Sequence, residues 1–152
     1  MDAPNSTIWG PALWNILHHS VERIGLPLNK LPNEESRIWL NLLNSLRFSL
    51  PCPQCKKHYT AYLLSHPIVS FKKDTIRQWL YNIHSNVNTI LNKSNDITLE
   101  QLEIYRQPFE FTKYYNIIIT HMKQSLQIGW SILIDVQRTI RCFEELKRYY
   151  DF

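Results

Sequence analysis

Apolar residues recur at helical spacing along almost the whole chain, and this pattern restricts the fold to the all-α class. No segment alternates as a strand would, and there is no internal repeat. A chain of 152 residues is one domain by length and can bury a core. The spacing predicts a first helix over residues 10–24, a second that begins at Asn33, and a third that follows a Cys-x-x-Cys pair and ends near residue 65. Further helices are predicted over residues 74–92, 98–106 and 112–150.

Polar and special residues place the helix ends in this prediction. Asn33 and Asp74 are candidate N-caps, and Thr98 with Gln101 has the spacing of a capping box. Gly129 interrupts the last helical stretch, where a glycine costs about 1 kcal/mol relative to alanine. We therefore expect two helices, or one kinked helix, after residue 112.

The Cys-x-x-Cys pair, Cys52 and Cys55, marks a helix start. Pro53 fits the first helical position, where its missing N–H costs nothing, and Cys52 falls near the N-cap. One helical turn brings Cys55 beside Cys52, within disulfide reach. The free N–H groups and the positive end of the helix dipole stabilise a thiolate there, which lowers its pKa. The spacing indicates a reactive dithiol, but it also fits half of a zinc site or two inert core cysteines.

A zinc site would need two more ligands, from Cys142 and a histidine. No second pair has zinc-like spacing, because His84 is followed by asparagines and no further histidine. We therefore expect no metal.

Charge and hydropathy exclude several classes of protein. The net charge is +4 and no Lys/Arg run exceeds a pair, so we expect no nucleic-acid partner. The start of the chain lacks a basic, apolar leader, and the apolar stretch 128–134 is too short to span a bilayer. Three cysteines are too few for a secreted disulfide scaffold. We therefore expect a soluble protein of the cytoplasm, without signal peptide or membrane segment.

Polar side chains border two of the predicted apolar stripes. His84 and Asn88 lie four residues apart on one helix face, and His18 follows Trp14 at the same spacing. These residues are either a solvated flank with hydrogen-bonded histidines or a polar edge that faces a ligand. His58, one turn after Cys55, either tunes the dithiol or lies on the surface.

Taken in order, these elements resemble the flavin-dependent sulfhydryl oxidases of the Erv/ALR family. The matching elements span residues 9–93 and read Trp14-Asn15-Ile16-Leu17-His18, Pro51-Cys52-Pro53-Gln54-Cys55, Trp79, His84-Ser85-Asn86-Val87-Asn88 and Leu91-Asn92-Lys93. The opening Trp9-Gly10-Pro11 and His66-Pro67 are similar to the short viral branch of that family, found in large cytoplasmic DNA viruses of the African swine fever virus type.

The resemblance implies a four- or five-helix bundle that binds FAD noncovalently, usually as a homodimer. It implies an oxidase domain over residues 1–107, followed by a C-terminal helical extension, 108–152, of unknown role. Only three glycines are present, so side chains on helices must hold the cofactor in place of a glycine-rich loop. By position, the cofactor-binding residues are Trp9, Gly10, Trp14, His18, Cys55, Tyr81, His84, Val87, Asn88 and Lys93, with Lys93 near the phosphates.

The chain departs from the family pattern at three points. Ser85 replaces an asparagine, and the structural cysteines that cellular members have at the Tyr81 position and beyond Lys93 are missing. Cys142 is the one cysteine besides the dithiol, so no second pair exists to act as an internal shuttle. Near the edge of an apolar stripe, Cys142 is a small core residue, a thiol that links subunits, or a thiol that accepts oxidation from a partner chain.

These observations lead us to expect a thiol oxidase of the host cytoplasm or the virion. A substrate thiolate attacks Cys52, Cys55 passes electrons to FAD, and oxygen is reduced to hydrogen peroxide. Without a shuttle pair, the expected partner is a thiol protein with its own Cys-x-x-Cys. Two alternatives stay open: a helical adaptor with an inert or metal-binding Cys-x-x-Cys, and a flavin-free dithiol carrier.

Overall fold

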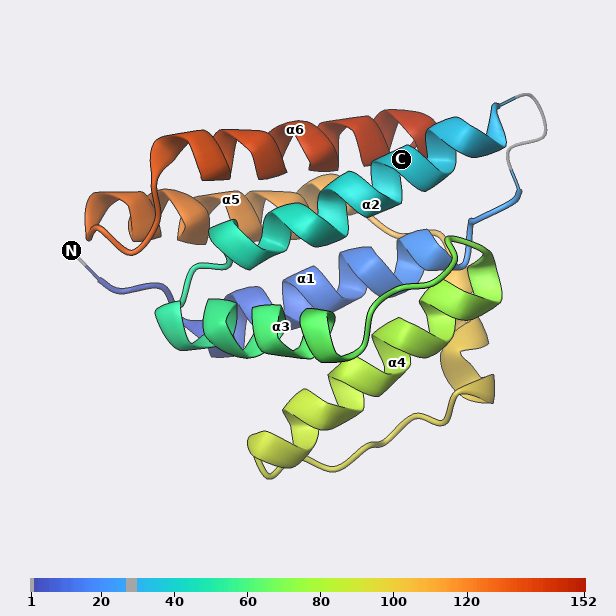
Figure 1. Ribbon diagram of the computed structural model, residues 1–152, viewed down its shortest axis with the longest axis horizontal. Helices are drawn as coiled ribbons and strands as arrows, with labels where there is room; N and C mark the ends of the chain where they lie inside the picture. Colours follow the sequence, from blue (N-terminus) through green and yellow to red (C-terminus); the bar gives the residue numbers. More distant parts are fainter. Residues whose placement is uncertain (1, 27–29) are drawn as a thin grey trace.

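The computed structural model describes residues 2–26 and 30–152, and all regular structure in these ranges is helical (Figure 1). This confirms the all-α class. The helices are α1 (Ser6–Val21), α2 (Pro32–Ser49), α3 (Pro53–Ser65), α4 (Lys73–Ile90), the 3-10 helix η1 (Glu100–Arg106), α5 (Phe111–Gln127) and α6 (Leu133–Tyr150).

Helix α1 begins one turn earlier than the sequence predicts. Its N-cap is Asn5, whose side-chain oxygen accepts a hydrogen bond from the backbone N–H of Thr7 at 3.0 Å. Pro11 therefore lies inside the helix instead of opening it. The prediction was wrong because Gly10-Pro11 reads locally as a helix start, whereas the cap at Asn5 already satisfies the first free N–H groups.

The predicted caps of α2 and α4 are also wrong, each by two residues. Leu31 and Lys72 are the N-caps, and neither makes a side-chain capping bond. Asn33 and Asp74 lie within the first turns. There Asp74 still interacts favourably with the positive end of the helix dipole. A residue type that suits both positions cannot fix the boundary to one residue.

The other boundaries agree with the prediction to within three residues, with α1 ending at Val21 instead of 24 and α4 at Ile90 instead of 92. Helix α3 begins at Pro53 with Cys52 as its N-cap. The capping box exists, since the N–H of Thr98 donates to Gln101 Oε1 at 2.9 Å and the N–H of Gln101 donates to Thr98 Oγ1 at 3.3 Å. The helix that follows it is 3-10 rather than α. Gly129, with φ of +82°, separates α5 from α6 into two helices.

One hydrophobic core is shared by the helices on both sides of residue 107. Helix α1 packs against α4 and α5, and α2 packs against α3 and α6. In Figure 1 the two C-terminal helices lie together along α1 and α2, on the side opposite α4. The core includes the fully buried side chains Ile16, Trp39, Ile76, Ile118 and Phe143. Besides α5, helix α1 contacts α4 and η1. None of the described helices is long and apolar enough to span a bilayer.

Candidate active site

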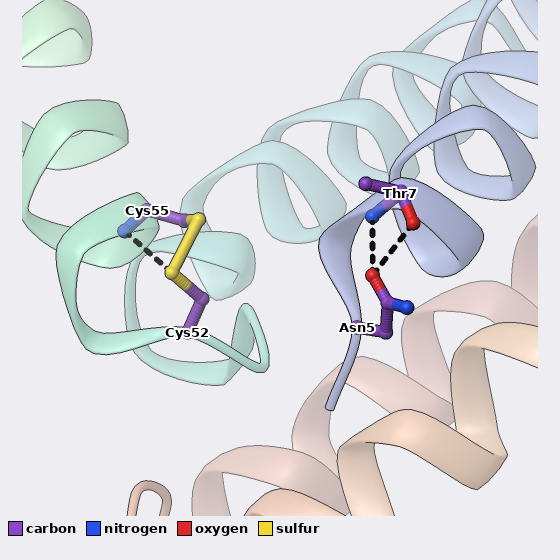
Figure 2. Close-up of a disulfide and its surroundings, with 4 residues drawn as sticks. All are labelled: Asn5, Thr7, Cys52 and Cys55. Carbon is purple, nitrogen blue, oxygen red and sulfur yellow. Dashed lines mark hydrogen bonds between the residues drawn. A yellow bond between two sulfur atoms is a disulfide. The ribbon is translucent and has the colours of Figure 1, made fainter. Parts of the chain in front are cut away.

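The two cysteines of the pair are joined as a disulfide at the start of α3 (Figure 2). Their Cα atoms are 5.2 Å apart, and both side chains are half-buried. The backbone N–H of Cys55 donates to Cys52 Sγ at 3.2 Å. Cys52 is therefore the N-cap, as predicted, and the capping atom is its sulfur. When the pair is reduced, the same N–H and the helix dipole favour a thiolate at Cys52.

A cleft of about 1330 Å³ opens beside the disulfide, between α1, α3, α4 and η1. Both cysteines line it. So do all the residues that the family resemblance implied: Trp9, Gly10, Trp14, His18, Tyr81, His84, Val87, Asn88 and Lys93. The structure therefore brings every predicted site residue to a single cavity. Ser85, the departure from the family pattern, lines the same cavity.

Four rings form an aromatic wall in this cleft: Trp14, His84, His18 and Tyr105. Trp14 and His84 stack at 4.1 Å with an angle of 8° between their planes. His84 and His18 follow at 5.2 Å and 27°, and His18 and Tyr105 at 5.0 Å and 19°. Rings that are nearly parallel suit a planar ligand, because offset stacking is a favoured aromatic geometry.

His18 and His84 are joined by a hydrogen bond of 3.0 Å between Nε2 of His18 and Nδ1 of His84. Burial, and then the proximity of His84, lower the pKa of His18 to about 3. Burial, and then the charge of Lys93, lower the pKa of His84 to about 4. At neutral pH both rings are therefore uncharged, and one donates to the other. This geometry rules out the solvated-flank interpretation for His84, whose ring is half-buried on Trp14.

Two buried polar atoms of the cleft, Trp9 Nε1 and His18 Nδ1, have no hydrogen-bond partner among the described residues. Buried polar atoms in folded proteins nearly always have a hydrogen-bond partner, and a buried polar group without one destabilises the fold by about 1–3 kcal/mol. Their place in a large cleft indicates that a ligand supplies the missing partners.

Other polar residues of the motifs fix the walls of the cleft. His58 Nε2 and Asn86 Oδ1 lie 2.9 Å apart and join α3 to α4. The amide of Asn88 donates to Asn95 Oδ1 at 3.0 Å, which fastens the turn that carries Lys93. Trp79 Nε1 donates to the carbonyl of His66 at 2.7 Å and so ties α4 to the end of α3.

Sequence reasoning missed one part of the site, the contribution of η1. Tyr105 closes the aromatic wall and Leu102 lines the cleft from the same helix. The capping box predicted a helix here, but a 3-10 helix has no 3.6-residue period that would show which side chains face inward.

A disulfide at a helix N-terminus that opens on an aromatic cleft defines a helical dithiol oxidoreductase. The sequence profile of the Erv1 / Alr family matches residues 11–107, which is more than half of the chain, so the chain belongs to the Erv1 / Alr family.

Three curated viral proteins described as FAD-linked sulfhydryl oxidases are similar to this chain. That of Invertebrate iridescent virus 3 is 28% identical over 106 residues, covering 68% of this chain and 69% of that protein. The protein of Acanthamoeba polyphaga mimivirus is 30% identical over 89 residues, covering 56% of this chain and 59% of that protein. The protein of Frog virus 3 is 27% identical over 94 residues, covering 61% of this chain and 62% of that protein. No solved structure matches the chain significantly.

Proposed function

We propose that this chain is an FAD-dependent thiol oxidase that forms disulfides in protein substrates through Cys52 and Cys55. The observation that carries the proposal is the shared cleft: the redox disulfide and every residue assigned to FAD by resemblance line one cavity. The description of three viral relatives as FAD-linked sulfhydryl oxidases agrees with it.

The residues of the cleft fit FAD. The volume of about 1330 Å³ exceeds the roughly 300–1,000 Å³ of ordinary small-molecule pockets, as a dinucleotide requires. The aromatic wall suits a planar ring system, and Trp9 Nε1 and His18 Nδ1 are free to bond with its polar atoms. Lys93, exposed at the rim, supplies a cation for the phosphates. These side chains, with Tyr81, Val87 and Asn88, would hold the cofactor without a glycine-rich loop.

The first chemical step belongs to the chain itself. A substrate thiolate attacks Cys52 Sγ, the Cys52–Cys55 bond breaks, and Cys55 leaves as a thiolate. A second substrate thiolate then attacks the substrate sulfur of the mixed disulfide, and Cys52 leaves. The N–H of Cys55 and the start of α3 stabilise that leaving thiolate. The substrate loses two electrons as its disulfide forms, and the cysteine pair gains them.

The chemistry that FAD supplies when bound is two-electron acceptance from the reduced pair and delivery to molecular oxygen, which yields hydrogen peroxide. The protein orients the cysteines toward the cleft and keeps His18 and His84 neutral beside it.

The same proposal includes the bounds of the oxidase domain, the kind of substrate, the oligomeric state and the place of action. The oxidase domain is residues 1–107, in agreement with the family match that ends at 107, and 108–152 is an addition to it. The substrate is a protein with its own Cys-x-x-Cys, because Cys142 has no companion for an internal shuttle. We further propose a homodimer that acts in the host cytoplasm or the virion.

Colour and oxygen consumption test the proposal. Purified protein should be yellow with flavin absorbance, and it should consume oxygen and release peroxide with dithiothreitol. Colourless, zinc-containing protein would favour the adaptor, and stoichiometric thiol oxidation without oxygen consumption would favour a flavin-free carrier.

A further inference from the structure

The 3-10 helix η1 has little apolar surface of its own to fix its position. Leu102 is its one buried side chain, at 3% exposure. The stretch 91–100 before it is mostly exposed. Short 3-10 helices are weakly stable by themselves. Nevertheless Tyr105 stacks on His18 at the end of the aromatic wall. Contacts with other elements must therefore hold Tyr105 there.

Two neighbouring residues just after α1 make these contacts. Arg23 Nη1 donates to the backbone carbonyl of Tyr105 at 3.2 Å, and Arg23 Nη2 donates to that of Gln107 at 3.1 Å. Arg106 Nε donates to the fully buried carboxylate of Glu22 at 3.1 Å. Charge-assisted bonds of this kind are about twice as strong as neutral ones. Arg23 therefore anchors the very residue that carries the ring.

Arg23 is held in turn by rings from the C-terminal part of the chain. Its guanidinium lies 5.5 Å from the ring centre of Phe109 and 4.9 Å from that of Phe152. Phe152 packs edge-on against Phe109 at 4.8 Å and stacks on Phe111 at 5.4 Å. These three rings lie outside the family match, which ends at residue 107. A guanidinium between aromatic faces is attracted to both.

We propose that Arg23 is a positioning residue of the cofactor cleft: it holds Tyr105 in the aromatic wall, and Phe109 and Phe152 hold Arg23. Segment 108–152 thereby contributes to FAD retention without lining the cleft. Tyr105 is an additional binding residue that contacts the planar part of the ligand. The inference rests on the proposed function in that the ligand is FAD.

The test is the rate of FAD release from purified holoprotein, followed as the rise in flavin fluorescence after dilution. Loss of an anchoring charged hydrogen bond should speed release about tenfold in Arg23→Met. Phe152→Ala should act in the same direction. Tyr105→Leu should release FAD at least as fast, whereas Tyr105→Phe, which keeps the ring, should rescue retention. The double variant Arg23→Met/Tyr105→Leu should be no faster than Tyr105→Leu, because both changes act through one ring.

Arg37 offers a matched control. It also ties two helices together, through a 2.7 Å ion pair with Glu145, but it does not line the cleft. Arg37→Met should release FAD at the wild-type rate, even if the substitution lowers the thermal unfolding midpoint of the protein. If the wild type is yellow but Arg23→Met or Tyr105→Leu releases FAD at the wild-type rate, the inference about Arg23 is refuted while the proposed function stands. Additive effects in the double variant would refute it as well. Colourless wild type would refute the proposed function, and the inference with it.

Discussion

Acidification should destabilise the fold through His18, and the size of the effect follows from its burial. The side chain is 2% exposed and its hydrogen bond to His84 holds it as a neutral ring. Its pKa in the folded protein is lowered to about 3, from an ordinary value of 6.5. Between these two values the unfolded chain binds a proton that the folded protein does not.

The sign of the effect is therefore fixed. Stability from this group is fully present above pH 6.5 and falls as the pH drops, because the unfolded state takes up the proton first. The slope is about 1.4 kcal/mol per pH unit for one histidine, which gives about 2 kcal/mol between pH 6.5 and pH 5. This is a large share of the roughly 5–15 kcal/mol that stabilises a typical domain. His84 adds to the loss in the same direction, reduced by its partial exposure to solvent.

Urea unfolding of wild type and His18→Gln at pH 7.5 and pH 5 measures the contribution of His18 to the pH dependence of the free energy of unfolding. Glutamine can still hydrogen-bond to His84 but does not titrate. The variant should lose about 2 kcal/mol less stability than wild type over this interval. The measurements at pH 7.5 give the cost of the substitution itself. Equal pH dependence in the two proteins would refute the reasoning, since it would mean that His18 takes up its proton in the folded state as readily as in the unfolded chain.

Three further predictions concern the redox path and the ligand. Cys55→Ser and Cys52→Ser should both abolish oxygen consumption with dithiothreitol while FAD stays bound, and only Cys52→Ser should show long-wavelength absorbance from a Cys55 thiolate beside the flavin. His84→Ala and Asn88→Ala should each weaken FAD binding about tenfold, as the loss of about 1–3 kcal/mol implies, in fluorescence titrations. Cys142→Ser should keep full turnover of dithiothreitol, because Cys142 is buried and burial raises the pKa of its thiol.

Each of these predictions has an outcome that contradicts it. Long-wavelength absorbance in Cys55→Ser instead of Cys52→Ser would reverse the roles of the two sulfurs. Equal FAD content in wild type and the His84 and Asn88 variants would remove both from the ligand set. Loss of dithiothreitol turnover in folded, flavin-loaded Cys142→Ser would place Cys142 on the electron path.

Local patterns in the sequence determined the helices and the dithiol. Apolar spacing predicts α1, α2, α4 and the helical stretch after residue 112, and Pro53 beside Cys52 predicts the start of α3. These features depend on neighbours within one or two helical turns, so the sequence carries them directly. The start of α1 at Ser6 was misplaced because Asn5 and Gly10-Pro11 both suit a helix start, and that of α2 at Pro32 because its N-cap, Leu31, is not a capping residue type.

Tertiary structure alone decided which side chains meet. His18 bonds to His84 across 66 positions, and Tyr105 reaches His18 from a 3-10 helix without helical periodicity. Periodicity likewise predicted helical structure after residue 112 but not that α5 packs on α1 and α6 on α2. The physical reason is that a helix pattern shows which face is apolar, whereas the partner of that face is set by packing the whole chain around one core.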